Sequence, residues 1–218
     1  MSTFILMKIL ESAPNRYDRG IYILTLGKLD KVYKHLTSHL KKGQKVLDLG
    51  CGTGALTLKA AHKGAKVKGI DINPQMLEIA KKRATKANLL PNISLFEMGV
   101  AELESEKSNI YDVVMSGLCF SELTESELIN TLKEIKRILK PGGLLLIADE
   151  VRPKNIFKKI INEITKFPLK IITYVIIQTT IHTIDNLPKK IKESGLLIES
   201  VKLNNIENFI ELVAKKPK

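Results

Sequence analysis

The chain has 218 residues, 44% of them hydrophobic and 27% charged, and its formal net charge at pH 7 is +12. These values fit one globular domain with its own core. Two cysteines cannot make a disulfide framework. The longest apolar stretch, residues 169–181, is too short to span a bilayer. The positive charge favours either an anionic partner or the lysine-rich bias of an A/T-rich genome, and both interpretations stay open.

Strands and helices alternate along most of the chain. Residues 1–42 are expected to be mostly helical, with a loop over 14–20, and the last two strands are joined by a polar turn. Such alternation implies a parallel sheet with helices on both faces. The turn Pro141-Gly142-Gly143 is expected to lead into the fifth strand. The pattern predicts strands over 45–49, 66–70, 93–97, 111–116, 143–149, 198–203 and 209–215, and helices over 54–63, 74–88 and 124–139.

We expect a single domain over residues 1–218. Its parts are an N-terminal helical cap (1–42), a ligand-binding core (43–150), an inserted lid (151–188) and a C-terminal antiparallel strand pair (189–218). The lid is rich in isoleucine with lysines opposite, so a helix lying on a membrane surface is the alternative interpretation.

Residues 46–54, VLDLGCGTG, are the most informative segment. An apolar strand runs into Gly50, Gly52 and Gly54, and glycines in such a turn let the backbone approach a ligand closely. An amphipathic helix follows, so the turn lies at a helix N-terminus, where free N–H groups favour polar or anionic ligand groups. The segment therefore predicts the first β-turn-α unit of a nucleotide-type site.

Two carboxylates narrow the kind of nucleotide. The spacing G-x-G-x-G differs from the dinucleotide fingerprint, and Asp48 beside the turn would repel a pyrophosphate but pair with an ammonium group. Asp71 ends the second strand, about where an acid would hydrogen-bond a ribose diol. The combination suits a cationic nucleoside that carries an amino acid.

Four ordered blocks resemble the motifs of class I S-adenosylmethionine-dependent methyltransferases. They are VLDLGCGTG, GIDINPQMLEIAKKRA, YDVVMSGL and LKEIKRILKPGGLLLIADE, and together they cover residues 45–150. The resemblance implies an α/β, Rossmann-like fold with a seven-stranded, mostly parallel sheet in the order 3-2-1-4-5-7-6, N-terminal helices and a lid between strands five and six. It also implies S-adenosyl-L-methionine as methyl donor and S-adenosyl-L-homocysteine as product.

The resemblance assigns most of the donor site. The glycine N–H groups would surround the methionine part, Asp48 would order the ammonium end, and Asp71 would accept both ribose hydroxyls. Family members often have Gly-Asp-Ala where this chain has residues 99–101, Gly-Val-Ala, so one side-chain contact to the adenine is absent. The residues assigned to the donor site are Asp48, Gly50, Cys51, Gly52, Gly54, Asp71, Ile72, Met76, Val100, Ala101, Ser116, Gly117 and Leu118.

The acceptor side is less defined. We expect Tyr17, Arg19, Arg152 and His182 to bind the acceptor, and we assign no catalytic residue. A general base is needed only if the accepting group starts protonated. The candidates for that base are His182, Glu150, Asp149 and Tyr17. We expect no metal site, because His35 and His39 lie four apart on a helix but lack a third ligand.

The expected function is methyl transfer to a small-molecule, quinone- or lipid-like, or corrinoid-related acceptor. The fourth motif has Ser116-Gly117-Leu118-Cys119 in place of the Asn/Asp-Pro-Pro-aromatic sequence that holds a flipped base, so exocyclic base amines and DNA are excluded. The alternatives are a protein or RNA methyltransferase and a non-catalytic donor-binding partner protein. We expect a cytoplasmic monomer or homodimer, with a weak membrane-surface or corrinoid-protein association as a further option.

Overall fold

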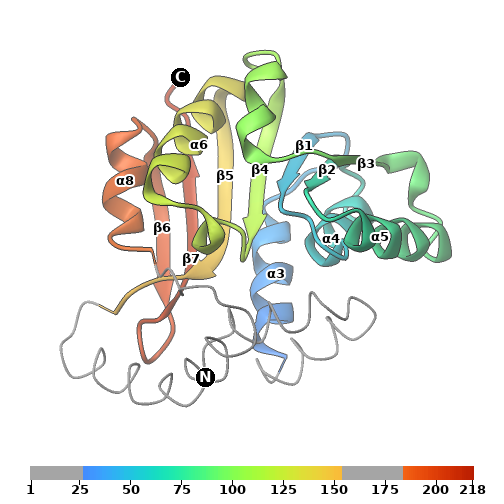
Figure 1. Ribbon diagram of the computed structural model, residues 1–218, viewed down its shortest axis with the longest axis horizontal. Helices are drawn as coiled ribbons and strands as arrows, with labels where there is room; N and C mark the ends of the chain where they lie inside the picture. Colours follow the sequence, from blue (N-terminus) through green and yellow to red (C-terminus); the bar gives the residue numbers. More distant parts are fainter. Residues whose placement is uncertain (1–26, 154–183) are drawn as a thin grey trace.

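The computed structural model describes residues 27–153 and 184–218, which form a seven-stranded sheet (Figure 1). The strand order is β3-β2-β1-β4-β5-β7-β6; β1 to β5 pair in parallel, and β7 is antiparallel to both of its neighbours. The predicted fold class and strand order are confirmed. The strands are β1 (Lys45–Leu49), β2 (Lys66–Asp71), β3 (Ile93–Glu97), β4 (Tyr111–Gly117), β5 (Leu139–Glu150), β6 (Leu197–Leu203) and β7 (Phe209–Lys215).

Helices cover both faces of the sheet and create two separate apolar cores. One core joins α3, α4 and α5 to one face, and the other joins α6 and α8 to the opposite face. In Figure 1, α6 and α8 lie toward the β6 end and α4 and α5 toward the β3 end. The helices are α3 (Lys28–Ser38), α4 (Ala55–His62), α5 (Pro74–Lys86), α6 (Glu125–Ile138) and α8 (Leu187–Glu193), with 3-10 turns η1 (Leu90–Asn92), η2 (Val100–Ser105) and η3 (Phe120–Glu122).

Alternation along β1 decides which side chains face which core. Leu47 and Leu49 enter the core beneath α6, whereas Val46 enters the core beneath α3 and α4. Successive side chains of a strand point to opposite faces, so Asp48 shares the face of Val46. A carboxylate is thereby placed under α4 in otherwise apolar surroundings.

The fifth strand differs from its expected bounds. It begins at Leu139 rather than at residue 143, so the Pro-Gly-Gly segment lies within the strand. The segment forms a bulge, because the pairing with β4 shifts from Tyr111–Leu139 to Val113–Leu144. Gly142 has φ +78°, and its N–H donates to the carbonyl of Lys216 at 3.0 Å. Proline and glycine suggested a turn, but backbone bonds to the chain end keep the segment in the sheet.

A second difference concerns α8, which the sequence pattern did not indicate. This helix begins inside the predicted lid and ends inside the predicted C-terminal strand pair. Leu187 and Ile191, four residues apart, are fully buried against the core beneath α6. With Pro188 early in the helix, the element is short, so tertiary packing rather than a long periodic pattern stabilises it.

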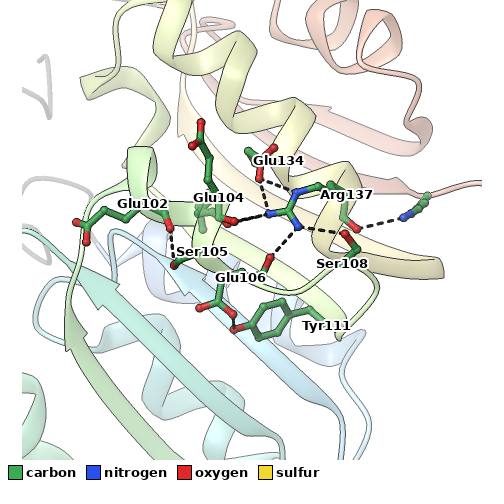
Figure 2. Close-up of polar contacts among 10 residues, drawn as sticks. Glu102, Glu104, Ser105, Glu106, Ser108, Tyr111, Glu134 and Arg137 are labelled. Carbon is green, nitrogen blue, oxygen red and sulfur yellow. Dashed lines mark hydrogen bonds and ion pairs between the residues drawn. The ribbon is translucent and has the colours of Figure 1, made fainter.

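Arg137 ties the end of α6 to the segment between η2 and β4, at the amino ends of the parallel strands (Figure 2). Its guanidinium donates to the carbonyl oxygens of Leu103 at 2.9 Å and Glu106 at 2.7 Å and also pairs with the carboxylate of Glu134. The Tyr111 hydroxyl donates to the Glu106 carboxylate at 2.8 Å. One side chain therefore satisfies several backbone acceptors of a loop that has little regular structure.

Just beyond β5, two segments that are far apart in the sequence pair through their backbones. Val151 and Ile184 form a parallel bridge, and the N–H of Arg152 donates to the carbonyl of Ile184 at 3.1 Å. The Arg152 guanidinium pairs with Asp185 at 3.1 Å. Residues 154–183, most of the predicted lid, lie outside the described residues, as do residues 1–26. In the part of the chain that the structure describes, none of the helices combines the length and hydropathy needed to cross a membrane.

Replacing residues 154–183 by a short Gly/Ser linker should leave the core folded. The residues on either side are already held together by backbone bonds, and shortening a loop changes its closure entropy only slowly, so the free energy of unfolding should stay within about 2 kcal/mol of the wild-type value. Urea denaturation measures it. The same deletion combined with Val151→Pro should be clearly less stable, because proline removes the N–H that donates to the carbonyl of Asn208 at 3.0 Å. Loss of cooperative unfolding in the variant with the deletion alone would contradict the expectation.

Candidate functional site

The carboxyl ends of the parallel strands bring the predicted donor residues to one edge of the sheet. Asp48 lies near the end of β1, the glycine turn follows that strand, Asp71 ends β2, and Gly117 ends β4. Since β1 pairs with both β2 and β4, these segments are immediate neighbours. This is the edge at which open α/β sheets bind their ligands.

The turn between β1 and α4 uses the backbone freedom of glycine. Gly50, Gly52 and Gly54 have φ values of +64°, +52° and +80°. A Cβ built on Gly50 would lie 2.6 Å from the Cβ of Cys119, whereas one built on Gly52 would meet no atom of residues 27–153 and 184–218 within 4 Å. Gly50 is therefore required by packing, and Gly52 leaves open space at the N-terminus of α4, where a ligand can approach the backbone.

Asp48 is buried, and one of its oxygens lacks a partner. Its Oδ2 accepts a hydrogen bond from the hydroxyl of Thr57, while Oδ1 has no hydrogen-bond partner among the described residues. The pKa of Asp48 is raised to about 7, chiefly by burial and also by the nearby charge of Asp71, while the hydrogen bond from Thr57 acts in the opposite direction. A buried acceptor atom of this kind is best satisfied by a cationic donor group.

Asp71 holds the turn with the same carboxylate that is predicted to bind a ribose. Its Oδ2 accepts the N–H of Gly52 at 2.7 Å, and its Oδ1 accepts the N–H of Asn73 at 2.9 Å. A carboxylate has about four acceptor positions in all, so these two backbone bonds are compatible with the predicted binding of a ribose diol. Next to it Ile72 is 74% exposed and lies beside Gly99, which offers an apolar surface for a flat ring.

The end of β4 carries a strained residue. Leu118 has φ +62°, a region that costs a leucine about 1–2 kcal/mol, and its N–H donates to the carbonyl of Ala148 at 2.8 Å. The buried hydroxyl of Ser116 has no hydrogen-bond partner among the described residues. Such strain gathers at functional sites, so this loop is a second side of the candidate site.

A family model described as a methyltransferase domain matches residues 46–143, the segment that holds the glycine turn and both carboxylates. This match assigns residues 46–143 to a methyltransferase domain. The seven-stranded order of the sheet agrees with this assignment.

Curated relatives resemble this chain in sequence, and solved structures resemble it in fold. A ubiquinone/menaquinone biosynthesis C-methyltransferase of Neisseria meningitidis is 33% identical over 148 residues, which are 65% of this chain and 58% of the relative. A 2-phytyl-1,4-naphtoquinone methyltransferase of Nostoc sp. is 34% identical over 145 residues, 64% of this chain and 62% of the relative. A solved S-adenosylmethionine-dependent methyltransferase from Aquifex aeolicus shows the same fold, with a TM-score of 0.61 at 20% identity over 86% of this chain and 88% of that one. The chain spans only 51% to 62% of the length of curated relatives such as these.

The two cysteines of the methyltransferase domain are packing residues. Cys51 is buried against Gly69 of β2, and Cys119 lies against Gly50. Burial raises the pKa of both thiols well above the usual value, so neither is a ready nucleophile. Cys51 therefore borders the predicted donor site through its backbone.

The remaining predicted donor residues differ in exposure. Met76 of α5 is buried in the core, Val100 is half-buried at the start of η2, and Ala101 is exposed. The N–H of Gly99 donates to the Glu102 carboxylate at 2.8 Å, which fixes the start of this turn. Val100 and Ala101 can offer backbone groups to a ring lying on Ile72, as the sequence suggested.

On the acceptor side the structure describes few of the predicted residues. Tyr17, Arg19 and His182 lie outside the described residues, and Arg152 is engaged with Asp185 at the surface. Asp149 is fully buried, and burial raises its pKa to about 7, although its oxygens accept the N–H groups of Phe120 at 2.8 Å and Glu150 at 2.7 Å. The carboxylate of Asp149 thereby fixes η3 to the end of β5.

Sequence reasoning missed Tyr33, which falls in the predicted N-terminal helical cap and was not assigned to the site. The hydroxyl of this buried α3 side chain would lie 2.3 Å from a Cβ built on Gly117. Helical spacing gave no sign of this contact, because it joins residues 84 positions apart. Among the residues that the structure describes, no group of three or more His, Cys, Asp and Glu side chains could hold a metal ion.

Proposed function

We propose that this chain is an S-adenosylmethionine-dependent methyltransferase that acts on a hydroxyl-bearing, quinol-like small molecule. The observation that carries the first part concerns the β1–α4 turn: within the described part of the chain, the buried Oδ1 of Asp48 has no hydrogen-bond partner and Gly52 has open space at its Cα. Asp48 would bind the donor's ammonium group, Asp71 its ribose hydroxyls and Ile72 its adenine. The donor supplies an electrophilic methyl group on a sulfonium sulfur, so the protein has to align the acceptor and exclude water.

The second part is supported by the relatives, which are named quinone methyltransferases. The hydroxyl group of a quinol can lose its proton and become an anion. The protein's net charge of +12 favours the binding of an anionic acceptor. A lipid or a corrinoid protein as acceptor, a cytoplasmic or membrane-peripheral location, and a monomeric or dimeric state remain the alternatives that experiment decides.

The test is transfer of a tritiated methyl group from S-adenosylmethionine. The acceptors are a reduced, prenylated naphthoquinol, phospholipid vesicles, purified corrinoid proteins and fractions of a cell extract. Label in the naphthoquinol supports the proposal, and label only in another fraction would replace the acceptor class. Tight donor binding with no label anywhere would show a non-catalytic donor-binding protein.

Donor binding should depend on pH through Asp48. Because the pKa of Asp48 is about 7 without ligand, most of this carboxyl is protonated at pH 5.5, and an incoming ammonium group must displace that proton. The dissociation constant for S-adenosylmethionine should therefore fall by about tenfold between pH 5.5 and 7. Calorimetry in buffers of different ionisation enthalpy measures both the affinity and the released proton. Asp48→Asn should bind more weakly at pH 7 and lose this pH dependence; an unchanged slope would assign the proton to another group.

A further inference from the structure

Tyr33 of α3 reaches the loop that borders the donor site. A Cβ on Gly117 would lie 2.3 Å from its hydroxyl oxygen and 2.7 Å from the adjoining ring carbon, so only glycine at residue 117 admits the ring. Gly117 pairs with Ala148 of β5, and Ala148 belongs to the core beneath α3. The tyrosine hydroxyl is therefore placed at the carboxyl ends of β4 and β5, on the α3 face of the sheet.

The two acids that end β5 point to opposite faces. Ile147 and Val151 enter the core beneath α6, and Ala148 enters the core beneath α3. By alternation Asp149 shares the face of Ile147, and Glu150 shares the face of Ala148 and Tyr33.

The cross-strand neighbour agrees with this assignment. Glu150 pairs with Phe209 of β7, which packs against the core beneath α3. Glu150 is one pleat beyond Ala148 toward the carboxyl edge, or about 7 Å along the strand, and its side chain is 3% exposed. Glu211, which pairs with Ala148, lies on the same face farther from the carboxyl edge and forms ion pairs with His35 and Lys202.

We propose that Glu150 and Tyr33 form the polar end of the acceptor site and recognise the hydroxyl group of the acceptor. This inference rests on the proposed methyl transfer. It separates two residues that the sequence left equivalent, because the carboxylate of Asp149 faces the opposite core and holds two backbone N–H groups.

The proton balance follows from the same geometry. The Glu150 carboxylate takes the proton from the acceptor hydroxyl as the acceptor gains the methyl group, and the sulfur keeps the electron pair of the broken S–C bond. The hydroxyl of Tyr33 donates a hydrogen bond to the acceptor oxygen as negative charge develops on it. Both groups are held in place by the sheet and by α3, so little rearrangement is needed.

The test compares Glu150→Gln, Glu150→Asp and Tyr33→Phe in the whole chain. Donor affinity is measured by calorimetry, and transfer of tritiated methyl is measured at saturating S-adenosylmethionine into the fraction that the wild-type protein labels. Glu150→Gln should keep the donor dissociation constant within about twofold and slow transfer by about 100-fold. Tyr33→Phe should slow transfer by about tenfold, and Glu150→Asp should recover part of the loss.

Tyr111→Phe is the matched control, because that hydroxyl binds Glu106 at the opposite edge of the sheet, and transfer should be unchanged. If Glu150→Gln binds the donor and transfers at the wild-type rate, or loses donor binding and transfer together, the proposal is overturned. If the wild-type protein labels a fraction other than the naphthoquinol, only the quinol assignment is wrong. The transfer rates of the variants relative to the wild type are then measured on that fraction. Donor binding with no label in any fraction overturns both proposals.

Discussion

Replacing Asp71 by alanine should weaken the binding of S-adenosylmethionine by roughly 1–3 kcal/mol, or about 5- to 150-fold. Two effects combine in this loss. The ribose hydroxyls lose a charged acceptor, and the N–H groups of Gly52 and Asn73, now bonded to Asp71 at 2.7 and 2.9 Å, lose theirs. The β1–α4 turn is then held less firmly, so the variant loses the proposed contact to the ribose and also the fixed backbone geometry at Gly52.

Titration calorimetry at pH 7 gives the affinity, and a thermal melt shows that each variant is folded. Asp71→Asn keeps one acceptor oxygen and should fall between the wild type and Asp71→Ala. Glu97→Ala is the matched control, because Glu97 pairs with Asp71 at the same level of the neighbouring strand and is exposed. Equal affinities for the wild type and Asp71→Ala would remove the ribose role and count heavily against the donor assignment.

Replacing Arg137 by alanine should lower the free energy of unfolding by about 2–4 kcal/mol without changing donor affinity. The carbonyl oxygens of Leu103 and Glu106 and the carboxylate of Glu134 would lose their donor in a partly buried place. The η2–β4 segment would then be anchored mainly by its apolar contacts. The lost interactions lie at the amino ends of the strands, away from the donor site.

Urea denaturation provides the free energy, and calorimetry provides the donor affinity of the same preparations. Lys133→Ala, one turn earlier on the exposed side of α6, should change stability by less than about 0.5 kcal/mol. Arg137→Lys keeps the charge but loses the fork of donors, so it should recover only part of the stability. A stability loss for Arg137→Ala no larger than that for Lys133→Ala would show that the loop is held by its apolar contacts alone.

Local sequence patterns predicted the fold well and drew the first candidate donor residues from one short segment, and the reasons are physical. A strand that ends in three glycines has few alternatives, and the alternation of strands and helices predicted a parallel sheet. The order of the strands came from the resemblance to the methyltransferase motifs. The sequence placed Asp48 beside the turn, and the structure shows that this carboxylate is also buried. These features depend on residues close together in the sequence, where periodicity and turn chemistry are reliable.

What escaped prediction depends on contacts between distant segments. Tyr33 meets Gly117 only because α3 lies across the sheet, and the bulge at Gly142 persists only because Lys216 bonds to it. The opposite orientation of Asp149 and Glu150 requires knowing which face each helix covers. The acceptor side is built from such contacts, so the sequence indicated the methyl donor far better than the acceptor.

The bridge between Val151 and Ile184 makes the segment between them a natural site for exchange. Each doubling of a loop's length costs only about 0.6 kcal/mol once its ends are fixed, so a segment of different length and composition can be grafted there at little expense to the fold. The proposed donor-binding residues lie at the carboxyl ends of the strands, outside the grafted segment, so donor affinity should be kept when the segment is replaced. Chimeras that carry the corresponding segment of a relative would show how far one scaffold can be redirected to new acceptors.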